Sequence, residues 1–265
     1  MTFNIIIQTH ERKESVLSLV HSLTSYTHHD LNIVVSDNGN QSWQELVNVS
    51  NVTIVDNGEH ISSRSHVLSI YRMNLSNAFI IHDDDKFDLD LFTRAIDFIQ
   101  NNNVQVLISP KEKIDKCWQP SAVLDVMEFY FLDARRNCPL ISGLYVSDMN
   151  LLHNFTLPNY LMEGKYADVQ IVGELLTNGN KAFVFSDPYV SYSEHDFNDN
   201  KVRNLDDRLA LRKYLQSHPQ LKARVLGNLI LFGYKRYYYY LIIGCFQSIF
   251  IGGYWKKIIL KIINK

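Results

Sequence analysis

Cysteine is scarce in this chain of 265 residues, which contains three: Cys117, Cys138 and Cys245. They lie far apart and form no Cys-x-x-Cys pair, which argues against a zinc site or a disulfide framework and indicates a reducing compartment. The first seven residues lack a basic segment and a cleavage site, so they predict a strand and not a signal peptide. Repeats, low-complexity runs and Gly/Ser linkers are missing as well. With 46% hydrophobic and 20% charged residues, the chain has the composition of a globular protein.

Acidic residues are absent from the last part of the sequence. After Asp207 there is no Asp or Glu, whereas residues 208–265 carry 11 of the 26 Lys and Arg residues. The preceding part holds all 28 acidic residues and is strongly negative. This asymmetry predicts that the basic tail contacts an anionic surface.

Strand and helix patterns alternate through about residue 110. Short apolar runs predict buried strands at 4–8, 32–36, 52–55, 78–81 and 104–108. Helical patterns lie between them, at 13–25, 43–49, 61–73 and around 91–99. Strict alternation of this kind favours a mainly parallel, doubly wound α/β sheet.

Polar residues follow the successive strands. They are Thr9, Asp37, Asn57 and the triplet Asp83-Asp84-Asp85. The carboxyl ends of parallel strands meet at one edge of a sheet, so these residues are predicted to share one crevice. Three adjacent carboxylates repel one another unless a cation or solvent takes up the charge. The triplet alone therefore fits either a solvated strand end or a divalent-metal site.

The alternation ends after residue 110. Residues 111–137 are irregular and rich in aromatic and charged side chains, and 139–146 predicts a strand that contains Ser142-Gly143. A helix is expected at 167–176 and a further strand at 182–185. The polar segment that follows contains His195.

Taken in order, these motifs resemble glycosyltransferase family 2, whose fold is called GT-A. The matching segments are Thr9-His10-Glu11-Arg12, Asp37-Asn38-Gly39, Asn57-Gly58 with Arg64, Asp83-Asp84-Asp85, and Ala167-Asp168 through Gly179. The resemblance covers about residues 3–200. The sequence departs from the family in having Ala-Asp in place of the usual Glu-Asp pair at 167–168. It also lacks the Gln-x-x-Arg-Trp motif of processive synthases.

The resemblance implies a GT-A domain over residues 1–204, with a donor half at about 1–110 and an acceptor half at about 111–204. The expected architecture is Rossmann-like: a mainly parallel sheet flanked by helices, with a small antiparallel extension. Residues 205–265 are expected to form a helical, basic region that associates with a membrane or forms oligomers.

The resemblance also assigns roles to the residues of the shared edge. The implied donor-binding residues are Thr9, Glu11, Asp37, Arg64, Asp83 and Asp84, although Asp84 has a purely structural role as its alternative. Asp85 and His195 are the implied ligands of Mn²⁺ or Mg²⁺, which would neutralise the diphosphate leaving group. Each has a simpler explanation: Asp37-Asn38-Gly39 is an ordinary turn sequence, and Arg64 or His195 can be a solvated surface residue.

The implied general base is Asp168, with Glu163 as the fallback. An inverting transfer needs a carboxylate near the acceptor hydroxyl to take its proton. The structural alternative for Asp168 is a helix N-cap. Ser142 and Gly143 are predicted to line the acceptor side.

The tail contains an uncharged stretch of 19 residues, 237–255, bounded by pairs of basic residues. Tyr and Trp beside Lys and Arg suit the lipid headgroup region, which favours an in-plane membrane contact. A protein-packed or oligomer-forming helix and a true membrane span are the alternatives. The expected location is cytoplasmic and peripheral, on the inner face of the cell membrane.

The sequence therefore predicts a metal-dependent, inverting glycosyltransferase of bacterial surface polysaccharide or lipopolysaccharide synthesis, such as O-antigen or capsule. Its partners would be a nucleotide-diphosphate sugar, with a UDP-sugar favoured, and a glycan or lipid-linked acceptor. No nucleic acid is expected. A sugar-phosphate nucleotidyltransferase is one alternative, although the turn after the first strand lacks its Gly-rich loop. A non-catalytic, membrane-associated binding protein on a degenerate GT-A fold is the other.

Overall fold

The computed structural model describes residues 1–39, 41–58, 60–61, 63–110, 112–119, 142–153 and 181–191. The chain divides into two compact units, Met1–Phe197 and Asn198–Lys265, and all described residues lie in the first. The expected boundary between residues 204 and 205, and the donor and acceptor halves, stay predictions.

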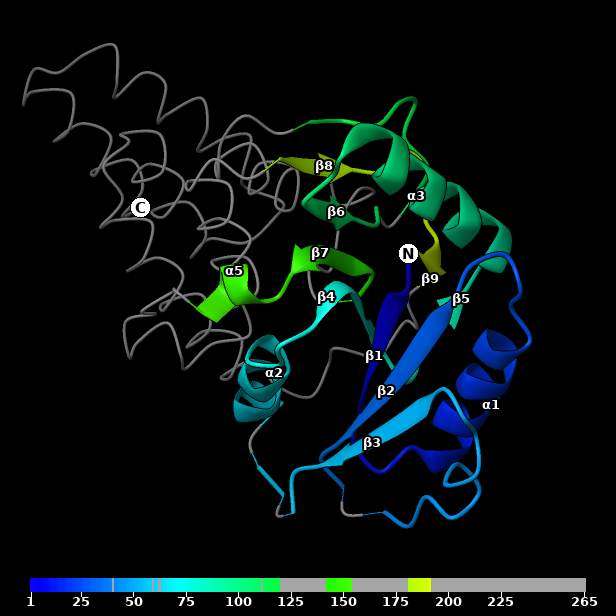
Figure 1. Ribbon diagram of the computed structural model, residues 1–265, viewed down its shortest axis with the longest axis vertical. Helices are drawn as coiled ribbons and strands as arrows, with labels where there is room; N and C mark the ends of the chain where they lie inside the picture. Colours follow the sequence, from blue (N-terminus) through cyan, green and yellow to red (C-terminus); the bar gives the residue numbers. More distant parts are fainter. Residues whose placement is uncertain are drawn as a thin grey trace, which may run out of the picture. The chain divides into compact units, whose positions relative to one another are not determined.

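Within the described residues, one large sheet has the strand order β3-β2-β1-β4-β7-β6-β8 (Figure 1). Its strands are β1 Phe3–Thr9, β2 Leu31–Asp37, β3 Val52–Asp56, β4 Ser76–His82, β6 Val106–Ile108, β7 Leu144–Asp148 and β8 Ala182–Val184. Every neighbouring pair is parallel except those of β7, which is antiparallel to β4 and β6. A small antiparallel sheet joins β5 (Lys86–Phe87) to β9 (Val190–Ser191). The predicted mainly parallel sheet with a small antiparallel extension is confirmed.

Helices cover both faces of the large sheet, which explains why its central strands are apolar throughout. The helices with described bounds are α1 Lys13–Thr24, α2 Ser63–Tyr71, α3 Leu89–Asn102 and the short α5 Asn150–His153. In β1, Ile5 and Ile7 share one core cluster with the apolar residues of α1 and α3. Ile6 is equally buried but points to the opposite face, because side chains alternate along a strand. That face is the side of α2, whose Ile70 is also buried (Figure 1).

The ends of α3 are fixed by local side chains. Asp88 is its N-cap and accepts hydrogen bonds from the backbone N–H groups of Asp90 and Leu91 at 3.1 and 2.9 Å. Asn103 ends the helix in the left-handed conformation, with φ of 50°. The acidic triplet lies just before β5 and this helix, so it occupies a short turn with both ends held.

Two local predictions are wrong. The short helix expected at 43–49 is a series of turns, although Trp43 and Leu46 are buried in the core as a helix face would be. The strand expected at 139–146 begins at Leu144, and Ser142 and Gly143 lie in the turn before it. Both errors came from reading an apolar pattern as regular structure where loop residues supply the same burial.

Candidate active site at the carboxyl edge

The polar strand ends lie side by side at one edge of the sheet. Thr9 of β1 is paired in register with Asp37 of β2, which is paired with Asp56 of β3. On the other side of β1, Gln8 is paired with His82, the last residue of β4. The predicted convergence of the polar turns at one edge is therefore confirmed.

Asp83 ties the ends of β1 and β4 together. Its carboxylate accepts hydrogen bonds from the Thr9 hydroxyl at 2.6 Å and from the His10 backbone N–H at 3.2 Å. The backbone N–H of Asp83 donates in return to the Gln8 carbonyl at 3.1 Å. Asp83 is buried, with 6% of its surface exposed. Its carboxylate thus fixes the position from which the rest of the triplet extends.

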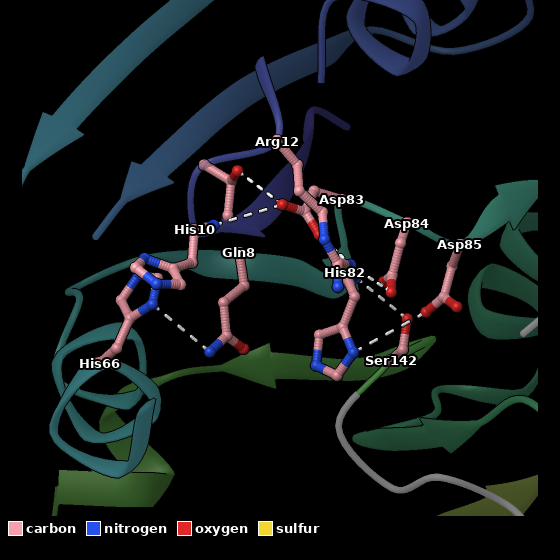
Figure 2. A network of polar contacts seen from close by, with 10 residues as sticks. Gln8, His10, Arg12, His66, His82, Asp83, Asp84, Asp85 and Ser142 are labelled. Atoms are coloured by element: carbon pink, nitrogen blue, oxygen red, sulfur yellow. Dashed lines mark hydrogen bonds and ion pairs between the residues drawn. The ribbon is translucent and has the colours of Figure 1, made fainter. Parts of the chain in front are cut away.

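Arg12 forms ion pairs with the first two acids of the triplet and offsets part of their charge. Its guanidinium lies 3.2 Å from Asp83 Oδ1 and also contacts Asp84 Oδ2 (Figure 2). Burial alone would lower the pKa of the guanidinium, but the hydrogen bond and charge of Asp84, and then those of Asp83, raise it above its ordinary value. Arg12 therefore carries a permanent positive charge at the triplet.

The third acid, Asp85, faces His82. The His82 ring Nδ1 lies 3.9 Å from Asp85 Oδ2. The backbone N–H of His82 donates to the Ser142 hydroxyl at 3.1 Å, so the turn before β7 fixes the end of β4 (Figure 2). His82, Asp84 and Asp85 can each direct one ligand atom to a common point, since these atoms lie within 4.8 Å of one another.

This donor set suits a hard or borderline divalent cation. Two carboxylates and one imidazole are ligands for Mn²⁺ or Mg²⁺ that leave about half of the octahedral positions to water or phosphate oxygens. The prediction that Asp85 is a metal ligand fits this geometry. His82, which adjoins the triplet, joins the set without having been predicted.

Asp37 is used quite differently. Its carboxylate accepts three hydrogen bonds from the following loop: Gly39 N–H at 2.8 Å, Gln41 N–H at 2.9 Å and Trp43 Nε1–H at 2.9 Å. The residue is fully buried. Asp37 therefore organises the loop after β2, and its predicted contact with a nucleobase or ribose stays a prediction.

The loops after β1, β2 and β3 are packed against one another. Gly39 approaches the backbone of Glu11 so closely that a Cβ at residue 39 would lie 2.8 Å from the Glu11 nitrogen. Asn38 exchanges two hydrogen bonds with the backbone of Ile61, at 2.7 and 2.9 Å. Glu11 is exposed and has a positive φ of 57°, which marks a tight turn. Thr9 and Asp37 are thus brought together as predicted, and the backbone of Glu11 lies against the same loop.

A buried histidine lies beneath this edge. His66 of α2 is 2.9 Å from the Ser36 hydroxyl through Nε2. Its Nδ1 lies 3.5 Å from the Gln8 side-chain amide (Figure 2). Burial lowers its pKa from 6.5 to about 4, outweighing the Ser36 hydrogen bond and the Asp37 charge, which raise it. The ring is therefore neutral at pH 7 and cross-links α2 to β1 and β2.

Gly143 is required by packing. Its φ of 76° is in the left-handed region, and an added Cβ would lie 2.7 Å from the Ser109 Cβ. Its N–H donates to the Ile80 carbonyl at 2.7 Å, and its carbonyl accepts from the Tyr189 hydroxyl. Ser142 and Gly143 thus anchor β7 beside β4, and their predicted role toward an acceptor stays a prediction.

Several predicted site residues lie outside the described residues. These are Asp168, Glu163 and His195, together with the tail at 205–265. Arg64 lies in α2, but its side chain is not among those described. In the part of the chain that the structure describes, no helix has the length and apolarity needed to cross a membrane.

Sequence reasoning missed three residues of the site: Arg12, His82 and His66. Arg12 lies in the quoted turn after the first strand, and His82 directly precedes the triplet, so closeness to a motif was the available signal. His66 gave no such signal, because histidine is intermediate in its tendency to be buried.

No family model matches the sequence, and no curated protein matches it significantly. Solved structures share its fold. TarS 1–349 of S. aureus in complex with UDP-GlcNAc is 14% identical with a TM-score of 0.60, covering 87% of this chain and 70% of that chain. The mannosyltransferase PcManGT of Pyrobaculum calidifontis, in complex with GDP-Man and Mn²⁺, is 12% identical with a TM-score of 0.56, covering 86% and 69%. These likenesses establish the predicted GT-A type of fold.

Proposed function

We propose that this chain is a metal-dependent glycosyltransferase that uses a nucleotide-diphosphate sugar as donor. The observation that carries the proposal is the group of His82, Asp84 and Asp85 at the carboxyl edge of a GT-A fold. Proteins of the same fold have been solved with UDP-GlcNAc and with GDP-Man and Mn²⁺, which supports a donor of this class. A UDP-sugar remains the favoured donor.

The residues at the carboxyl edge of the sheet would have different roles in donor binding. Asp85 and Asp84, with His82, would hold Mn²⁺ or Mg²⁺, and the bound ion would offset the negative charge that develops on the leaving diphosphate. Asp83 holds the triplet against β1, and the loop organised by Asp37 would form the adjoining side of the donor site. Tight preorganisation of this kind lowers the cost of aligning the reacting groups.

The remaining parts of the proposal come from the sequence. Transfer with inversion would use Asp168 as general base toward an acceptor hydroxyl, with His195 as a further metal or phosphate ligand. The acceptor would be a glycan or lipid-linked sugar of a bacterial surface polysaccharide. The basic tail would hold the enzyme on the inner face of the cell membrane.

The test is a thermal-shift screen of UDP-, GDP-, CMP- and dTDP-sugars with and without Mn²⁺. One sugar nucleotide should stabilise the protein only when Mn²⁺ is present, by about 2.7 kcal/mol at a hundredfold excess over Kd. Asp85→Asn should abolish this shift, whereas the stability of the unliganded protein should change by much less. Absence of stabilisation by every donor with Mn²⁺ would contradict the proposal.

A further inference from the structure

Arg12 contacts a carboxylate that also belongs to the candidate cation group. Its guanidinium contacts Asp84 Oδ2, and Asp84 belongs to the group that can share a cation with His82 and Asp85. Only the Asp84 carboxylate would separate a cation bound by that group from the guanidinium. Like charges this close repel each other, and water screens the repulsion incompletely because Asp84 is only 16% exposed.

A diphosphate would offer Arg12 an alternative anionic partner. The Arg12 side chain is 44% exposed, compared with 6% for its partner Asp83, so it is the more solvent-accessible member of the pair. A guanidinium suits phosphate oxygens as well as carboxylates, since its planar donors match both. A diphosphate placed at the triplet would supply an anionic partner for Arg12 and oxygen ligands for the cation together.

We propose that Arg12 competes with the divalent cation at the acidic triplet, so that the cation binds tightly only together with a diphosphate. The inference deepens the proposed function and rests on it for the identity of the diphosphate ligand. Arg12 acts here as a positioning residue that sets the order and selectivity of binding. A coupling of this kind is reciprocal, so the cation must raise the affinity for diphosphate by the same factor.

The competition follows from charge balance in the described part of the molecule. Asp83, Asp84 and Asp85 bring three negative charges into one turn, and Arg12 contacts two of them. With Arg12 in place, the cation group offers a smaller net negative charge than its carboxylates suggest. Removal of the guanidinium should therefore increase affinity for a cation alone, which is the opposite of what loss of a merely structural residue would do.

The experiment is a Mn²⁺ titration followed by electron paramagnetic resonance, which reports the ion left in solution. It uses the full chain as wild type, Arg12→Gln and Arg12→Lys. Arg72→Gln is the matched control, because Arg72 is an exposed arginine that follows α2 and precedes the amino end of β4. Each protein is titrated alone, with inorganic pyrophosphate and with UDP, and Mn²⁺ bound by the ligand in protein-free solution is subtracted.

Arg12→Gln should bind Mn²⁺ alone about tenfold more tightly than wild type, and Arg72→Gln should match wild type. Pyrophosphate should raise the Mn²⁺ affinity of wild type about tenfold more than that of Arg12→Gln. Arg12→Lys keeps the positive charge, so its affinity for Mn²⁺ alone should be closer to wild type than that of Arg12→Gln. Circular dichroism of each variant checks that it is folded.

Three results would overturn the inference: equal affinity of wild type and Arg12→Gln for Mn²⁺ alone, no Mn²⁺ binding by either, or equal enhancement by pyrophosphate in both. The proposed function fails separately. If pyrophosphate shows the coupling but neither UDP nor any sugar nucleotide binds, the competition at the triplet stands and the donor assignment does not. If sugar nucleotides bind with Mn²⁺ but Arg12→Gln changes nothing, the reverse holds.

Discussion

Two acidic strand ends lie at the same edge of the sheet, one strand apart, and they are used in opposite ways. Asp37 after β2 is fully buried and gives its carboxylate to three donors within its own loop. The triplet after β4 takes partners from other segments, and Asp84 keeps 16% of its side chain exposed, against 7% for Asp85. Asp37 is thus satisfied within its own loop, whereas Asp84 and Asp85 are carboxylates that could share a cation with His82.

The comparison teaches that residue type and position at an edge do not settle a role. A buried carboxylate whose oxygens accept hydrogen bonds from its own loop is satisfied without a ligand. Carboxylates crowded into one turn gain from an added cation because they repel each other. The four substitutions below separate these two situations, in order of decreasing effect.

The largest effect is expected from Asp85→Asn. Loss of a metal-ligating carboxylate should reduce sugar transfer by about a thousandfold, or about 4 kcal/mol of transition-state stabilisation. The unfolding midpoint in urea should change little. Donor-dependent product formation at saturating Mn²⁺ measures the effect, and activity within threefold of wild type would contradict a role for Asp85 in metal binding.

Asp37→Asn should show the opposite profile. In the variant, an NH₂ group replaces one carboxylate oxygen, so it would point a donor at the N–H donors of Gln41 and Trp43. The negative charge that strengthens these hydrogen bonds is also lost. We expect a loss of about 3 kcal/mol in the free energy of unfolding. Urea unfolding measures it, while Mn²⁺ affinity of the folded variant should be unchanged. A stable variant that no longer binds a nucleotide would instead make Asp37 a donor ligand.

Much of this arrangement was available from the sequence. The parallel strands, the shared edge and the approach of Thr9 to Asp37 and Asp83 follow from apolar runs that alternate with helical patterns. The antiparallel β7 between β4 and β6 did not follow, because strand order depends on contacts distant in sequence. Nor did the internal use of Asp37, since a turn sequence does not reveal whether a carboxylate faces the loop or a ligand.

Gly143→Ala tests how far the triplet depends on β7. The left-handed backbone and the close Ser109 contact should cost about 2 kcal/mol of stability. Because Ser142 accepts a hydrogen bond from the His82 backbone, a smaller secondary loss of Mn²⁺ affinity is expected. Thermal unfolding and Mn²⁺ titration measure the two effects. A stabilised variant would show that the turn before β7 adopts another backbone conformation.

The smallest effect concerns His66, which lies beside the Asp37 strand end, and it depends on pH. The pKa of His66 is lowered to about 4 in the folded protein, against 6.5 for an ordinary histidine. As pH falls, His66 is therefore protonated in the unfolded chain before it is protonated in the folded protein. The contribution of the neutral His66 ring to stability is complete above about pH 6.5 and is lost as pH falls toward 4. We expect a loss of about 1 kcal/mol between pH 7.5 and 5.5 from this residue.

His66→Gln should remove that part of the pH dependence while lowering stability at pH 7.5. The measurement is urea unfolding at both pH values for wild type and variant. His21 is a suitable control, because it lies exposed on α1 and His21→Gln should leave the pH dependence intact. An unchanged pH slope in His66→Gln would mean that the ring is not held neutral.

The most direct test of the central claim is the position of Mn²⁺ in a crystal grown with Mn²⁺ and UDP or GDP. Anomalous scattering locates the ion without reference to any assumed ligand. The account predicts a Mn²⁺ peak in coordination contact with the Asp85 carboxylate and with diphosphate oxygens, and none at Asp37. A nucleotide bound with its diphosphate and Mn²⁺ away from the acidic triplet would contradict it.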